Sequence, residues 1–231
     1  MTAMTRHVLK LTVFVSTLSA FGIVAGQQVP EATQVLQQIA GAAESLRGYG
    51  PAEPAEQKTI QEQSTRISKN ADLLRNLLQK RQVSNSFRRT LQQDASALDR
   101  LKEKKPPART VVVTTTGVAD DLDAKARYVG APIWGAQVAD APVRARTKSG
   151  NREEPGYRVW YVIRGVADDP NEFSPFPRLS TPTDHDLPPG AYLMWTRRPE
   201  GGPEGVKTPV DVGKPGQPQT EVDLPVPSGG K

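Results

Sequence analysis

The histidine nearest the C-terminus stands between two aspartates, an arrangement that raises the question of metal binding or catalysis. Asp184, His185 and Asp186 follow one another in the segment TPTDHDLPP. An imidazole and two carboxylates are ligands that transition metals accept, and a histidine beside a hydroxyl can activate a nucleophile. Successive residues of an extended segment point to opposite sides, which places His185 away from both carboxylates. We therefore expect a solvated polar loop with no metal, no cofactor and no catalytic residue.

Tryptophan offers a second kind of site. The chain has three, Trp134, Trp160 and Trp195. Exposed indole rings can stack on sugars, whereas in a small β-domain such rings more often fill the core. We expect the core. The three tryptophans and residues 184–186 are nevertheless the candidate ligand-facing residues, and polysaccharide is the candidate ligand.

The residue types that are missing exclude several classes of chemistry. The 231 residues include no cysteine, which excludes disulfides, thiol catalysis and cysteine-bound zinc. No glycine-rich phosphate loop, dinucleotide fingerprint or nucleic-acid-binding motif is present. The net charge of +5 is modestly basic, and we expect no nucleic-acid partner.

The N-terminus has the layout of a secretory signal peptide. Arg6 and Lys10 precede an apolar run over residues 11–24, and small residues follow it. The run is shorter than the roughly 20 residues that a membrane-spanning helix needs. We predict cleavage after residue 26, export to the periplasm or the exterior, and no transmembrane span afterwards. An uncleaved anchor is the alternative.

A sharp change in composition divides the rest of the chain. Residues 52–105 contain no glycine and only Pro54, whereas 18 of the 21 prolines lie from Pro106 onward. Glycine and proline disfavour helices, so the first segment is predicted helical and the second all-β. The expected class is α+β with segregated domains: helical residues 27–105, a linker at 106–108, a β-domain at 109–227 and a disordered tail at 228–231.

Apolar residues recur at heptad spacing through the helical segment. They form a first stripe over residues 32–49, a second one made of Ile60, Ile67, Leu74 and Leu78, and a third over residues 87–101. The pattern falters at residues 82–87, where Ser84 or Asn85 could cap a new helix. A helical hairpin, a three-helix bundle, a coiled coil with a partner, and one unbroken helix over 54–104 all remain open.

Short runs rich in β-branched and aromatic residues predict seven strands in the second segment. The first, RTVVVTTTG, begins at Arg109, and the strongest lies near residues 156–166, where alternation predicts a central strand. The others lie near residues 131–138, 142–149, 190–198, 207–213 and 220–227. Seven short strands over about 120 residues are typical of a sandwich.

The segment LPPGAYLMW carries a resemblance to a known family. Leu187, Pro188, Gly190 and Tyr192 match the L-P-x-G-x-Y signature of transthyretin-like (prealbumin-like) β-sandwiches, which include carboxypeptidase regulatory-like domains. The stretch SGNREEPGYRVWYV is similar to the opening of that fold. The resemblance implies a non-catalytic module over residues 109–227, with Tyr192 pointing into the core. We recognise no family in the helical part.

Together these observations predict an exported, non-enzymatic interaction or scaffold protein of the bacterial envelope. Residues 52–105 carry 12 Lys or Arg against 7 Asp or Glu, so basic amphipathic helices would contact an envelope protein or self-associate through Ile60, Ile67, Leu74 and Leu78. The β-domain would form a rigid head. The alternative is a carbohydrate-binding module that uses exposed tryptophans. The ligand, the partner and the oligomeric state are not fixed by the sequence.

Overall fold

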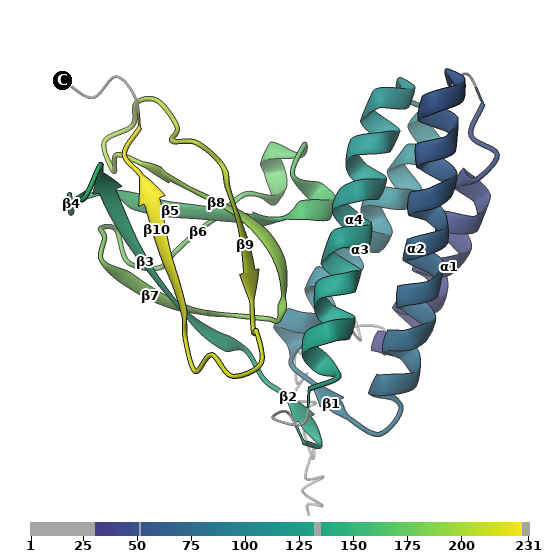
Figure 1. Ribbon diagram of the computed structural model, residues 1–231, viewed down its shortest axis with the longest axis horizontal. Coiled ribbons are helices and arrows are strands. Elements are labelled where there is room, and N and C mark those ends of the chain that lie inside the picture. The colour runs from purple at the N-terminus through teal and green to yellow at the C-terminus, as the bar shows by residue number, and fades with distance from the viewer. Residues whose placement is uncertain (1–30, 51, 132–134, 228–231) are drawn as a thin grey trace, which may run out of the picture.

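The structure, a computed structural model, describes residues 31–50, 52–131 and 135–227. The predicted signal peptide, the predicted tail and Trp134 lie outside these residues. Four helices form the first half and two main sheets the second (Figure 1), which confirms the α+β class. No helix of the described ranges is long and apolar enough to cross a membrane.

The helices run up and down and form a four-helix bundle. They are α1 (Ala32–Leu46), α2 (Pro54–Leu78), α3 (Asn85–Lys104) and α4 (Ala108–Val129). Helix α1 packs against α2 and α3, and α4 packs against the same two helices. The three predicted stripes all face this interior, and Phe87, Leu91 and Leu98 are completely buried there. The bundle contains one helix more than the largest number predicted.

Of the alternatives left open by the sequence, the structure has two helices over residues 54–104, with a break between α2 and α3. Ser84 is the N-cap of α3, and its Oγ accepts the Phe87 N–H at 3.1 Å. The same hydroxyl donates to Asp140 at 2.7 Å. Strand β1 (Gln82–Val83) fills the break and pairs with β2 (Gln137–Val138). This pairing joins the start of α3 to the start of the β-sheet half.

Replacing Ser84 by alanine is expected to lower the free energy of unfolding by about 1–2 kcal/mol, because the α3 cap and the bond to Asp140 are lost together. Urea denaturation followed by circular dichroism measures the change. Thr65→Ala is the matched control, because the exposed Thr65 hydroxyl bonds only to the Gln61 carbonyl of its own helix. Equal effects of the two substitutions would contradict the capping role.

The strand predicted from Arg109 is wrong, because these residues form the first turns of α4. Helix α4 lies between the other helices and the sheets and buries side chains on both sides. Residues 111–116 are all valine or threonine, and such a run of β-branched residues favours a strand locally. The predicted linker at 106–108 covers part of the turn between α3 and α4 and the first residue of α4, and the helical part extends to Val129.

The second half contains two four-stranded sheets. One has β3 at its centre, paired with β10 on one side and with β7 and β4 on the other; the second has the order β6-β5-β8-β9. The strands are β3 (Ala141–Ser149), β4 (Arg152–Glu153), β5 (Arg158–Ile163), β6 (Ser174–Pro175), β7 (Thr183–Leu187), β8 (Gly190–Arg197), β9 (Thr208–Val212) and β10 (Thr220–Pro225). Strand β5 is central, as predicted. Two short 3-10 helices, η2 (Arg164–Val166) and η3 (Pro170–Glu172), follow it.

One continuous core joins the bundle to the sheets. Apolar residues of α1 to α4 belong to the same buried cluster as those of β3, β5, β8, β9 and β10. Helix α4 packs directly on η2 and β8, as Figure 1 shows at the centre of the molecule. The α3–α4 side of the bundle and the β8 side of the sheets therefore meet at a seam, and this seam positions the sites described below.

Candidate functional site

The predicted polar loop around His185 is strand β7, which pairs with β3. Asp184 and Asp186 are exposed on one face, as predicted, and His185 lies half-buried on the other. The His185 ring packs against Phe176 and Tyr161, with ring centroids 5.1 and 5.8 Å away. Burial lowers the pKa of His185. The two carboxylates therefore do not converge with the imidazole on a common ligand.

Asp184 belongs to a charged ladder across the outer face of the β3 sheet. Its carboxylate lies 4.0 Å from Arg144 on the neighbouring strand β3. On the other side of β3, Lys148 and Arg146 approach Asp223 of β10 at 2.6 and 3.3 Å. Opposite charges on adjacent strands are typical cross-strand pairs. The charges of this face largely compensate one another.

Asp223→Asn is expected to cost less than about 1 kcal/mol at pH 7, as is usual for exposed ion pairs. The hydrogen bond from Lys148, with the charge of Arg146, holds the pKa of Asp223 below its ordinary value. The stabilisation is therefore present above the pKa of the unfolded chain and is lost as the pH falls through the lowered folded value. Urea denaturation at pH 7 and pH 3 checks this. Exposed Asp186→Asn is the control, and a loss independent of pH would contradict the prediction.

The described tryptophans do not form an open stacking platform. Trp195 is fully buried, and its ring packs edge-to-face on Phe173 at 4.8 Å. The ammonium group of Lys207 lies 4.3 Å from the centroid of Phe173 and 5.0 Å from that of Trp195. Trp160 is half-buried, with the Arg158 guanidinium 5.5 Å from its ring centroid. These contacts give both rings structural roles.

The LPPG turn and Tyr192 are placed as predicted. The Tyr192 side chain is fully buried, and its hydroxyl donates to the Pro188 carbonyl at 2.8 Å. Met194, two residues further along β8, is also fully buried. Trp195, which points to the opposite face of the strand, is buried too. Strand β8 is therefore covered on both faces.

The helix stripe proposed for docking lies inside the bundle. Ile60, Ile67 and Leu74 are fully buried, and Leu78 is 5% exposed. Helices α1 and α4 of the same chain cover α2. No partner can reach these side chains while the bundle is folded. Any contact with a partner must use the outer surface of the helices.

A buried charge cluster, which the sequence analysis does not predict, lies at the seam. Asp94 of α3 and Asp121 and Lys125 of α4 are all completely buried. The Lys125 ammonium forms an ion pair with Asp121 and lies 3.7 Å from Asp94. The second oxygen of Asp121 accepts the backbone N–H of Ala191 at 2.7 Å. The cluster thus links α3, α4 and the first residues of β8.

Burial determines the protonation of this cluster. It raises the pKa of Asp94 to about 7, against the attraction of Lys125. It lowers the pKa of Lys125 to about 8, against the attraction of Asp94. Two carboxylates and one ammonium carry a net negative charge when all are ionised. The raised pKa of Asp94 favours its protonated form below about pH 7, which lowers the negative charge of the cluster.

Three glycines allow the backbones to approach closely at the seam. A Cβ on Gly117 of α4 would lie 2.8 Å from the Arg164 carbonyl carbon and closer still to its oxygen. A Cβ on Gly165 would collide with Asp94, and one on Gly190 would lie 2.6 Å from Asp121. The glycine of the LPPG turn therefore has a second role, because it makes room for the charge cluster.

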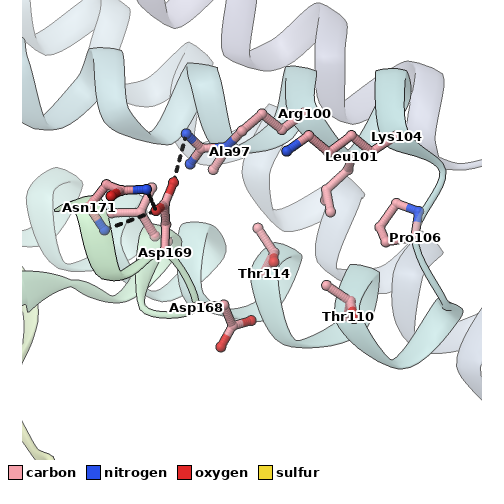
Figure 2. A pocket seen from close by; sticks show the side chains of 12 residues that line it. Ala97, Arg100, Leu101, Lys104, Pro106, Thr110, Thr114, Asp168, Asp169 and Asn171 are labelled. Atoms are coloured by element: carbon pink, nitrogen blue, oxygen red, sulfur yellow. Dashed lines mark hydrogen bonds and ion pairs between the residues drawn. The ribbon is translucent and has the colours of Figure 1, made fainter. Parts of the chain in front are cut away.

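A cleft of about 350 Å³ opens at one end of the seam, between α3, α4 and the segment η2–η3 (Figure 2). One wall is fixed by Arg100, which lies 3.2 Å from Asp169. Asp169 in turn accepts the Asn171 backbone N–H at 3.1 Å. Lys104 and Asp168 line the cleft from different walls and are exposed. Neither side chain forms a hydrogen bond or ion pair with another described residue.

In the described part of the chain, no group of three or more histidine and acidic residues is arranged to hold a metal ion. Comparisons with protein-family models, with curated proteins and with solved structures found no match to this chain. The resemblance to transthyretin-like domains therefore stays a prediction.

Proposed function

We propose that this chain is an exported, non-enzymatic interaction protein of the bacterial envelope, with a transthyretin-like head and a basic bundle that binds an acidic envelope protein. The buried Tyr192, bonded to Pro188, supports the proposed family of the head. The continuous core and the buried seam cluster support a rigid body in which bundle and head move together.

The observation that carries the proposal is the basic end of the bundle where α2 ends and α3 begins. Residues 80–89 include Lys80, Arg81, Arg88 and Arg89 and no acidic residue. Arg81 donates to the Val129 carbonyl and Arg88 to the Asn85 side chain, at 2.8 Å, so both keep an uncompensated charge. Within the described ranges, none of the four forms an ion pair.

Asp140, an acidic residue that this segment contacts, forms no ion pair with its four cations. Asp140 accepts hydrogen bonds from Ser84 and Ser86 at 2.7 Å rather than from a cation. The outer face of the β3 sheet differs, because its cations pair with Asp184 and Asp223. An uncompensated basic surface attracts acidic partners and accelerates their association.

A photo-crosslinking amino acid at exposed Gln79 tests the proposal in the full chain. The captured envelope protein is identified and purified, and its affinity is measured at low and high salt. Reversing two charges, Lys80→Glu with Arg89→Glu, is expected to weaken binding at least tenfold. Reversing Arg152 and Arg178 of the head changes the net charge equally and is expected to leave the affinity within twofold. Equal losses from both pairs would refute the basic end as the binding surface.

Export has its own test. The full chain is expressed in a bacterial host, and the fractionated product is sequenced from its N-terminus. We expect an envelope protein that begins at residue 27, or at residue 26 if the alternative cleavage is used. A cytoplasmic product that retains Met1 would contradict export and leave the binding test unaffected.

A further inference from the structure

We propose that the cleft between α3, α4 and η2–η3 binds a short free peptide, with Lys104 holding the peptide carboxylate and Asp168 its ammonium group. This site is separate from the basic end of the bundle, and its test does not depend on the proposed envelope partner. The cleft volume of about 350 Å³ lies within the range of small-molecule sites.

The free polar groups of the cleft set the charge pattern of the ligand. Lys104 supplies a cation from the end of α3, and Asp168 supplies an anion from the segment after η2 (Figure 2). A ligand that satisfies both carries a negative and a positive group at its two ends. A zwitterionic peptide has this pattern, whereas a sugar or a simple anion does not.

The middle of the cleft suits a peptide backbone and small side chains. Thr110 and Thr114 line it from α4 (Figure 2), and their hydroxyls form no hydrogen bond with the described residues. A hydroxyl can both donate and accept, as a peptide group requires. Leu101 and Val166 add apolar surface for a side chain.

The walls of the cleft are held before a ligand arrives. Arg100 pairs with Asp169 at 3.2 Å and approaches Glu172 at 3.8 Å. Gln93 of α3 donates to Glu172 at 2.8 Å. These contacts fix the segment η2–η3 against α3. Preorganised walls reduce the ordering cost of binding.

The test is a titration of the ¹⁵N-labelled chain, residues 27–231, with trialanine, followed by amide chemical shifts at 50 mM salt. We expect saturable shifts confined to the cleft, at residues such as Thr110, Thr114 and Asn171. Acetylating the peptide N-terminus or amidating its C-terminus is expected to weaken binding about threefold to fivefold, as expected for one exposed ion pair.

Two variants test which side chain binds each end of the peptide. Lys104→Gln should weaken trialanine by the same threefold to fivefold but leave the amidated peptide unchanged, because that peptide has no carboxylate to lose. Asp168→Asn should weaken trialanine and leave the acetylated peptide unchanged. Lys102→Gln is the control, because Lys102 pairs with Asp99 at 3.6 Å and does not line the cleft. Absence of saturable shifts, shifts outside the cleft, or blocked peptides that bind as tightly as trialanine would overturn the proposal.

Discussion

Replacing Lys125 by methionine is expected to destabilise the folded chain by about 3–5 kcal/mol at pH 8. Methionine keeps much of the lysine volume, so the main loss is the charge. Asp94 and Asp121 would then share a seam without a cation, and both are completely buried. A buried carboxylate without a partner cation pays its desolvation cost in full. Urea denaturation measures the change in the free energy of unfolding.

The penalty should depend on pH with a defined sign. Burial already raises the pKa of Asp94 to about 7, and loss of Lys125 removes the attraction that opposes this shift. The folded variant must therefore keep Asp94 protonated at a pH where the unfolded chain has lost that proton. The folded state binds more protons, so its stability falls as the pH rises. We expect a smaller penalty at pH 5 than at pH 8.

Two further variants make the prediction specific. Adding Asp94→Asn to Lys125→Met removes one buried negative charge and should recover much of the lost stability. Arg127→Met is the matched control, because Arg127 pairs with Asp123 at 2.9 Å on the exposed side of the same helix. That variant should change stability by less than about 0.5 kcal/mol. A Lys125→Met loss below 1 kcal/mol, or no recovery in the double variant, would contradict the cluster.

Strands with one buried face and one solvent-exposed face could be predicted from the sequence. In β3, the buried Val143 and Ala145 alternate with the exposed Arg144 and the half-exposed Arg146. In β10, the buried Val222 and Leu224 alternate with the exposed Glu221 and Asp223. Such alternation has the two-residue period of a strand and therefore predicts one. Strand β7 shows no such alternation in its sequence, because the residues on its inner face include the polar Thr183 and the half-buried His185.

Helix α4 could not be recognised from its first turns. Val111, Val112 and Val113 have high β-propensity, and tertiary packing overrides such local preferences. The helical signal lies further along, where Val118, Leu122 and Ala126 recur every four residues and are all buried. The proline pair at 106–107 hides this signal, because prolines at a change of composition predict a domain linker. In the structure it separates two helices of one bundle.

The seam cluster shows why the site was only partly predictable. Asp121 and Lys125 are four residues apart, the spacing of an ordinary surface ion pair. Their burial results from long-range packing of η2 and β8 on α4, which no local pattern reports. Asp94 did carry a signal, because it lies three residues after Leu91 and four before Leu98. A charged residue on an apolar stripe indicates a buried partner.

Gly117→Ala is expected to destabilise the chain by about 3 kcal/mol, although alanine favours helices more than glycine does. The added Cβ would lie 2.8 Å from the Arg164 carbonyl carbon and closer to its oxygen. These are backbone atoms of η2, which cannot rotate away as a side chain can. Helix α4 and η2 would have to separate, and the adjacent charge cluster would be exposed to water. Thermal and urea denaturation measure the loss.

Gly41→Ala is the control that measures helix propensity alone, without the close contact that a Cβ at position 117 would make with Arg164. Gly41 is exposed within α1, and a Cβ added there meets no atom within 4 Å. The same substitution should therefore stabilise the chain by about 0.5–1 kcal/mol, the intrinsic advantage of alanine in a helix. Opposite signs at the two glycines would show that close packing at the seam, and not the helix itself, requires glycine at position 117. Stabilisation at both positions would mean that α4 and η2 do not approach as closely as the structure shows.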